Sequence, residues 1–265
     1  MTLLSFGDLH VSAATGGRDI GTDDPIVVLM HGAAMDRTVW SLQTRWLAHH
    51  GSPVIAIDLP GHGASPEAER SSVQDYADWV ADLVAALGRP VHLVGHSMGS
   101  FIALEATQRC ELESIVLVGT AQAMPVHPKL VEAAEANDPL AAQLMSGWAF
   151  AHQTRTGPHP SPGSSMVGST QAMIAQAKPG VLHHDLVMCA DYEAALTTAE
   201  LVAVPTTLLL GEADRMTPVR NAQPLIEAME GATVHVVSGT GHMVQIEAPE
   251  ITRAAIAAAV ASVHD

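Results

Sequence analysis

The stretch Gly95-His96-Ser97-Met98-Gly99 constrains the fold more than any other part of the sequence. The apolar run before it, at residues 91–94, predicts a buried strand, and residues 100–106 have the composition of a helix. A serine on a sharp strand-to-helix turn projects its hydroxyl, and glycines fit where the flanking backbone crowds together. The helix also directs its free N–H groups toward the same point. We predict that Ser97 is a nucleophile; the alternative is an ordinary glycine-rich turn.

Strand-like and helical patterns alternate over most of the chain. Helical spacing is clear at residues 38–50 and 72–87, and Thr217-Pro218 opens a helix that is expected to run to Met229. A chain of 265 residues is long enough for one large α/β domain. The alternation is interrupted between residues 121 and 198, where no strand is recognisable. Strands are predicted at residues 3–14 (two short ones), 25–30, 53–57, 91–94, 114–118, 204–210 and 233–237.

Composition limits the classes of partner. The formal net charge is −16, which argues against nucleic acid and anionic membrane surfaces, because both need basic patches. No apolar run reaches the roughly 20 residues of a membrane span, and the N-terminus does not resemble a signal peptide. Cys110 and Cys189 fit buried apolar positions better than a disulfide framework. We expect a cytoplasmic protein that acts on a small molecule; a homodimer is compatible with the sequence.

Several further motifs follow predicted strands in a defined order. Together with the serine turn they resemble the α/β-hydrolase family of the serine esterase type, and the resemblance covers nearly the whole chain. The motifs are His31-Gly32-Ala33, the run from Asp58 to Ser65 (Asp-x-Pro-Gly-His-Gly-x-Ser), Gly211-x-x-Asp214-x-x-x-Pro218, Gly239-x-Gly241-His242 and Glu247-Ala248-Pro249-Glu250.

The resemblance implies a role for each catalytic position. Ser97, Asp214 and His242 occur in the chain order of the family's triad, each after a predicted strand. His242 is the expected base, and Asp214 is the acid that orients it, with Glu212 as an exposed competitor. The backbone N–H groups of Ala33 and Met98 are the expected oxyanion-hole donors.

The resemblance also implies the architecture. We expect a mostly parallel eight-stranded sheet flanked by helices, formed by residues 1–120 and 199–265. Residues 121–198 are expected to form a helical cap, inserted after the sixth strand and part of the same structural unit. Cap helices are predicted at residues 129–135, 140–151, 170–177 and 184–195.

Other histidines suggest roles that we weigh differently. His31 could act as a base, but its motif favours a residue that braces the oxyanion loop. Asp58 and His62 could form an acid–base pair, and we favour hydrogen bonds that brace their turn. The cap histidines have no cysteine or glutamate partners at ligand spacing, so we predict no metal site and no cofactor. They are His152, His159, His183 and His184.

Methionines are frequent near the catalytic motifs. Met35, Met98, Met216 and Met243 each lie within two residues of a catalytic residue or its motif. Thioether side chains are apolar and adaptable, so we predict a tolerant pocket for small to medium neutral esters. The substrate-binding candidates are Met35, Trp148, Met216 and Met243. The cap residues Met145, Phe150, Met166 and Met173 could also line it, although packing within the cap explains each of them equally well.

The predicted reaction is hydrolysis of a carboxylic ester through an acyl-enzyme on Ser97. Serine at this position argues against dehalogenation and epoxide opening, which use aspartate in this family. A C–C hydrolase of vinylogous diketones shares the fold and triad, but the cap has few basic groups to bind a dienoate: Lys129, Arg155 and Lys178. A lactonase and a non-catalytic ligand receptor remain alternatives.

Overall fold

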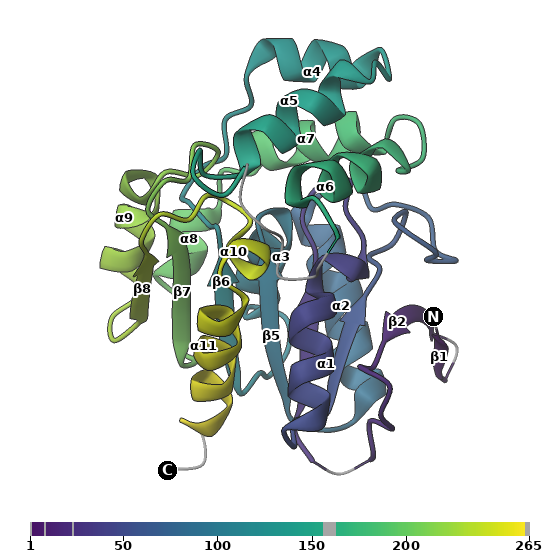
Figure 1. Cartoon of the computed structure of the whole chain (residues 1–265). Helices are drawn as coiled ribbons and strands as arrows, with labels where there is room; N and C mark the ends of the chain where they lie inside the picture. Colours follow the sequence, from purple (N-terminus) through teal and green to yellow (C-terminus); the bar gives the residue numbers. More distant parts are fainter. Residues whose placement is uncertain (1, 8, 23, 156–162, 263–265) are drawn as a thin grey trace.

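The computed structural model describes residues 2–7, 9–22, 24–155 and 163–262. It contains an eight-stranded sheet with the strand order β1-β2-β4-β3-β5-β6-β7-β8 (Figure 1). Strand β2 pairs antiparallel with β1 and with β4, and the remaining pairs are parallel. The predicted mostly parallel eight-stranded sheet is therefore confirmed. The strands are β1 (Thr2–Phe6), β2 (Leu9–Ala14), β3 (Ile26–Met30), β4 (Val54–Ile57), β5 (Val91–His96), β6 (Ser114–Val118), β7 (Thr206–Gly211) and β8 (Thr233–Val237).

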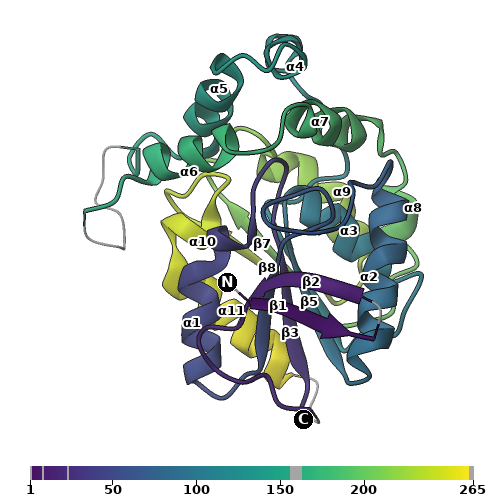
Figure 2. The same ribbon diagram turned by 90° about the vertical axis from the view of Figure 1, so that its right-hand side faces the viewer.

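Helices cover both faces of the sheet. Helices α1 and α11 pack together on one face, and α2, α3, α8 and α9 lie on the other (Figure 2). Among the described residues, no helix is both long and apolar enough to cross a membrane. The core helices are η1 (Arg37–Trp40), α1 (Ser41–His49), α2 (Val73–Leu87), α3 (Met98–Ala106), α8 (Ala195–Ala199), α9 (Val219–Ala228), α10 (Val244–Glu247) and α11 (Pro249–Ala261).

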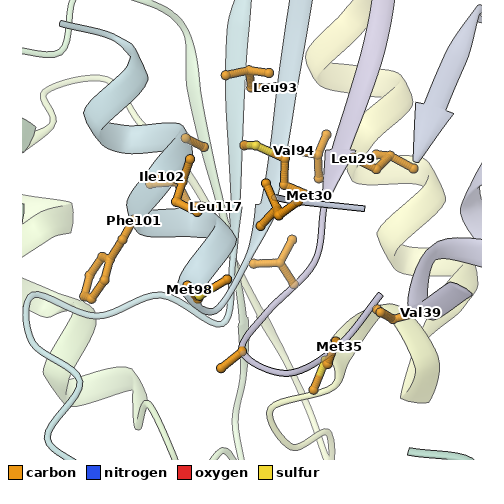
Figure 3. Packing of buried hydrophobic residues seen from close by; sticks show 14 of the residues in the cluster. Leu29, Met30, Met35, Val39, Leu93, Val94, Met98, Phe101, Ile102 and Leu117 are labelled. Carbon is orange, nitrogen blue, oxygen red and sulfur yellow. The ribbon is translucent and has the colours of Figure 1, made fainter. Parts of the chain in front are cut away.

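The central strands are buried on both faces. Every residue of β3, β5, β6 and β7 is buried, as expected for parallel strands covered by helices on both sides. Ile102 of α3 and Leu117 of β6 lie together on one face of the sheet, whereas Leu29 of β3, paired with Val94 of β5, points to the opposite face (Figure 3). This packing gives the ends of the strands fixed positions, and the catalytic candidates follow those ends.

A cap covers the carboxyl end of the sheet. It follows β6, as predicted, and stands above the ends of the strands (Figure 1). Helix α8 spans the proposed boundary at residue 198 but packs against α3 and α9 of the core. His159, one of the cap histidines considered above, lies outside the described residues. The cap helices are α4 (Pro128–Glu135), α5 (Leu140–Ala149), α6 (Met166–Ala175) and α7 (Val181–Asp191).

The prediction of one helix over residues 184–195 is wrong. Helix α7 ends at Asp191, and Tyr192 adopts an extended conformation before α8 begins. The Tyr192 ring lies 4.7 Å from that of Phe101, and its hydroxyl donates to the carboxylate of Glu105. The buried carboxylate of Glu105 needs hydrogen-bond donors, and Tyr192 provides one. This contact fixes Tyr192 on α3. The helix therefore ends where the chain returns to the core.

Candidate active site

Ser97 lies on a tight turn between β5 and α3. Its backbone has φ 53° and ψ −118°, a conformation that residues other than glycine rarely adopt. The turn is held by Ser97 N–H donating to the Val118 carbonyl at 2.9 Å and Ser100 N–H donating to the Ser97 carbonyl at 2.8 Å. Strained backbone of this kind persists where the surrounding structure enforces it, and it is frequent at functional sites.

The two glycines of the motif are required by close backbone contacts. A Cβ atom on Gly95 would lie 2.0 Å from the Gly99 carbonyl oxygen. A Cβ atom on Gly99 would lie 2.7 Å from the His31 carbonyl oxygen. The crowding inferred from the sequence is therefore present, and it extends to the loop after β3.

We expect Gly95→Ala to lower the free energy of unfolding by about 3 kcal/mol or more, because backbone atoms of α3 cannot move aside cheaply. Urea unfolding would measure the change. Gly147→Ala in α5 is the matched control, since its Cβ would lie 3.7 Å from the nearest atom, on Arg155. Alanine inside a helix is favoured over glycine by about 0.5–1 kcal/mol, so Gly147→Ala should be neutral or stabilising. Equal losses in the two variants would contradict the prediction.

Asp214 and His242 form a buried pair at the ends of β7 and β8. His242 Nδ1 lies 2.8 Å from Asp214 Oδ2. The other carboxylate oxygen, Oδ1, accepts from the N–H groups of Met216 at 2.8 Å and Thr217 at 2.9 Å. Burial alone would raise the pKa of Asp214, but His242 and the Thr217 hydrogen bonds outweigh it and lower the pKa to about 2. Asp214 is therefore ionised at neutral pH and can fix the orientation of the imidazole.

Thr217 belongs to this arrangement, although the sequence analysis placed it only at the start of a helix. Its hydroxyl oxygen lies 2.8 Å from Asp214 Oδ2, 3.1 Å from the Gly119 carbonyl oxygen and 3.1 Å from His242 Nδ1. It holds the acid loop against the end of β6. The spacing of Asp214 and Thr217 in the sequence could have indicated this contact, because an aspartate side chain often accepts hydrogen bonds from the N–H groups two and three residues further along the chain.

The imidazole of His242 faces the pocket that also contains Ser97. Among the described residues, the buried His242 Nε2 has no hydrogen-bond partner, and so it is available for the Ser97 hydroxyl. Ser97 and His242 both line the same cavity. Hydrogen bonds of catalytic groups are often long without substrate and shorten when it binds. The structure thus brings Ser97, His242 and Asp214 to one place, as the sequence predicted.

The two backbone N–H groups predicted as oxyanion-hole donors, those of Met98 and Ala33, belong to segments beside Ser97. Met98 is the first residue of α3, where an N–H has no partner within the helix. Its side chain packs into the core, so its role here would be that of the backbone alone (Figure 3). Ala33 lies in a turn closed by Met35 N–H to the Gly32 carbonyl at 3.2 Å, and no acceptor for the Ala33 N–H occurs among the described residues.

The pocket above Ser97 is mainly apolar and lies between the core and the cap. Its empty volume is about 670 Å³, including solvent at its mouth. Trp148 and Met216 line it, as predicted, whereas Arg215 is an exposed cation at its rim. The apolar lining residues are Ala33, Met124, Pro125, Val126, Leu130, Met145, Trp148, Leu186, Cys189 and Met216.

The structure places two of the predicted substrate-binding residues elsewhere. Met35 lines a separate hollow beside His62 and Lys178, because the chain reverses at the left-handed residue Ala34 (φ 51°). Met243 is completely buried in the core and does not line the pocket. Being next to a catalytic residue in the sequence did not put either side chain in the pocket.

The remaining polar motifs brace loops of the core. His31 Nδ1 lies 2.8 Å from the Gly32 carbonyl oxygen, and His31 Nε2 accepts from Leu59 N–H at 3.1 Å. Asp58 accepts from the N–H groups of Arg37 and Ala64 at 2.8 and 2.9 Å. His62 pairs with Asp185 of the cap instead of Asp58. Within the described ranges, no group of three or more potential metal ligands occurs.

Comparisons with known proteins point to one family. The chain is 28% identical over 250 residues to human monoglyceride lipase, covering 88% of this chain and 80% of that one. It is 40% identical over 84 residues to (E)-2-((N-methylformamido)methylene)succinate hydrolase of Acinetobacter baylyi, a match that spans 31% of each chain. A solved structure of a thermophilic esterase superposes with a TM-score of 0.79 at 26% identity, over 99% of this chain and 97% of that one. Residues 27–255 match the model of the alpha/beta hydrolase family. The chain belongs to the alpha/beta hydrolase family.

Proposed function

We propose that this protein hydrolyses carboxylic esters of small to medium size through an acyl-enzyme on Ser97. The observation that carries the proposal is the position of His242. Its Nε2 has no hydrogen-bond partner among the described residues and lies in an apolar pocket shared with Ser97, while Asp214 holds Nδ1. This is the arrangement that acyl transfer by a serine nucleophile requires. The esterase and lipase among its relatives support the same class of reaction.

The mechanism follows from these positions. His242 Nε2 takes the proton of the Ser97 hydroxyl, and Ser97 Oγ attacks the carbonyl carbon of the ester. The N–H groups of Ala33 and Met98 stabilise the oxyanion, at no cost of reorganisation because the backbone holds them in place. His242 then protonates the leaving alcohol, and water attacks the acyl-enzyme with His242 again acting as the base.

The pocket lining favours neutral substrates. Most of its described lining residues are apolar, none is Asp or Glu, and the one Lys or Arg among them, Arg215, is exposed at the rim. Lys129, Arg155 and Lys178, the basic groups considered for a dienoate carboxylate, do not line it. The lining therefore favours a neutral ester of modest size as the substrate. It is less suited to the substrate of a C–C hydrolase, whose carboxylate would have to bind deep in the pocket.

Steady-state hydrolysis of p-nitrophenyl acetate, butyrate and octanoate tests the proposal. We expect turnover of all three esters, with the highest kcat/KM for butyrate. Each additional methylene that the pocket buries should stabilise the bound substrate by about 0.8 kcal/mol, until the acyl chain becomes too long for the pocket. A hemisuccinate ester of the same phenol is the charged comparison and should react more slowly than butyrate.

Turnover confined to the charged ester would contradict a neutral substrate. If no ester reacts, labelling of Ser97 by a fluorophosphonate distinguishes two cases. Labelling would show a working nucleophile in a more selective pocket and would direct the search to lactones and vinylogous diketones. Absence of both turnover and labelling would refute the hydrolase proposal and favour a ligand receptor.

A further inference from the structure

Asp185, on the cap helix α7, joins the cap to two loops of the core. Its side chain is completely buried. One oxygen, Oδ2, accepts hydrogen bonds from the Ala34 N–H at 2.7 Å and from His62 Nε2 at 2.8 Å. The other oxygen, Oδ1, has no partner among the described residues. Burying a carboxylate costs free energy unless it is paired, so the two hydrogen bonds to Oδ2 offset most of the desolvation cost of Asp185.

Both ring nitrogens of the partner histidine, His62, face oxygen atoms. His62 Nδ1 lies 2.9 Å from the Pro60 carbonyl oxygen, and Nε2 lies 2.8 Å from Asp185 Oδ2. Opposite a carbonyl oxygen and an ionised carboxylate, both ring nitrogens act as donors and the imidazole is positively charged. Burial alone would lower the pKa of His62, but Asp185 and the hydrogen bonds outweigh it and raise the pKa. His62 and Asp185 therefore form a buried ion pair between the core and the cap.

The second contact acts on the turn that contains Ala33. Ala34 has φ 51°, a left-handed conformation that is unfavourable for a residue with a side chain. The Ala34 N–H donates directly to Asp185, which holds the Ala33–Ala34 peptide plane in one orientation. Ala33 lines the catalytic pocket, so a rotation of this turn would also move its N–H group.

We propose that Asp185 is a positioning residue for the oxyanion hole, which is complete only when the cap is docked on the core. The inference rests on the proposed function, because Ala33 N–H matters only if an oxyanion forms at Ser97. A second contact from the cap reaches the histidine loop: the Ala149 carbonyl accepts from His242 N–H at 2.8 Å. Glu247 Oε2 also accepts from Ala151 N–H at 3.0 Å. The cap thus contacts the segments that provide the base and one oxyanion donor.

Asp185→Ala tests the proposal, with Asp191→Ala as a matched control on the exposed end of the same helix. We expect kcat for p-nitrophenyl butyrate to fall roughly 100-fold in Asp185→Ala with KM changed less than about threefold, because loss of an oxyanion donor affects the transition state. Asp191→Ala should remain within twofold of wild type. Asp185→Asn should retain most of the activity, since its carboxamide oxygen can accept from Ala34 N–H. Circular dichroism and Tm would verify folding of each variant.

A buried unpaired imidazolium could prevent Asp185→Ala from folding, so a second variant is needed. His62→Ala/Asp185→Ala removes both charges and avoids that cost, yet it still deprives Ala34 N–H of its acceptor. It should show the same loss of kcat. A folded Asp185→Ala or double variant with kcat within threefold of wild type would overturn the proposal. So would a tenfold rise in KM with unchanged kcat, which would indicate a role in substrate binding.

The rate constant for labelling of Ser97 by a fluorophosphonate separates this inference from the proposed function. The phosphonyl oxygen occupies the same hole, so labelling should slow by a similar factor in Asp185→Ala without any need for ester turnover. If wild type is labelled but hydrolyses no ester, the ester proposal fails and the labelling ratio still tests Asp185. If wild type is not labelled, both proposals fail.

Discussion

Ser97→Ala is expected to reduce kcat for p-nitrophenyl butyrate by about 10⁴-fold or more, because no other group can form the acyl-enzyme. The residual rate would come from the oxyanion donors and from substrate binding. The substitution removes one oxygen from a residue that is 8% exposed, so the fold should be retained. Steady-state kinetics and fluorophosphonate labelling would measure the loss, and labelling should disappear completely.

Ser100→Ala is the control for this experiment. Ser100 lies one turn along α3, is completely buried, and donates its hydroxyl to the Ser97 carbonyl at 2.6 Å. The same chemical change at this position leaves the nucleophile in place, and its effect should be less than about tenfold. If Ser97→Ala retained substantial turnover, or if both variants lost activity equally, Ser97 would not be the nucleophile.

The catalytic candidates could be predicted from the sequence because each follows a recognisable strand end. Strands β5, β7 and β8 precede Ser97, Asp214 and His242. In a parallel sheet the carboxyl ends of neighbouring strands meet at one edge, so residues far apart in sequence converge there. Close backbone contacts at the Ser97 turn also allow only glycine at positions 95 and 99, so the motif can be recognised in the sequence.

Side-chain directions in the loops could not be predicted in this way. Met35 and Met243 are sequence neighbours of the oxyanion turn and of His242, yet both face away from the pocket. Proximity in sequence does not determine orientation in an irregular segment, where no period relates one side chain to the next. Met216, which was predicted on the same grounds, does line the pocket, and so does Trp148, which was predicted from its place in the cap.

Asp185 shows a different limit of sequence analysis. Its partner His62 lies 123 residues away, on the opposite side of the interface between core and cap. In the sequence, Asp185 is one polar residue of a helix, and solvent exposure would be the ordinary expectation. Only the docking of α7 on the loops after β3 and β4 reveals that it is buried. The same holds for Tyr192, which breaks the predicted cap helix because it packs on α3.

Asp214→Asn is expected to lower kcat by about 10³- to 10⁴-fold with a small change in KM. An asparagine amide in place of Oδ2 would donate to His242 Nδ1 and favour the tautomer with its proton on Nε2. That tautomer cannot accept the Ser97 proton. The imidazolium formed in the reaction would also lose the charge of the carboxylate. Because the pKa of Asp214 is about 2, wild type keeps this charge throughout the neutral range, and raising the pH within that range should not restore the variant.

Glu212→Gln is the matched control, because it makes the same carboxylate-to-carboxamide change in the same loop. Glu212 is exposed and accepts from Ser238 Oγ at 2.7 Å and Gly239 N–H at 2.9 Å, away from His242 Nδ1. Its activity should remain within about twofold of wild type. A larger loss in Glu212→Gln than in Asp214→Asn would assign the acid to Glu212. Comparable activity of Asp214→Asn and wild type would mean that Thr217, 3.1 Å from His242 Nδ1, suffices to orient the imidazole.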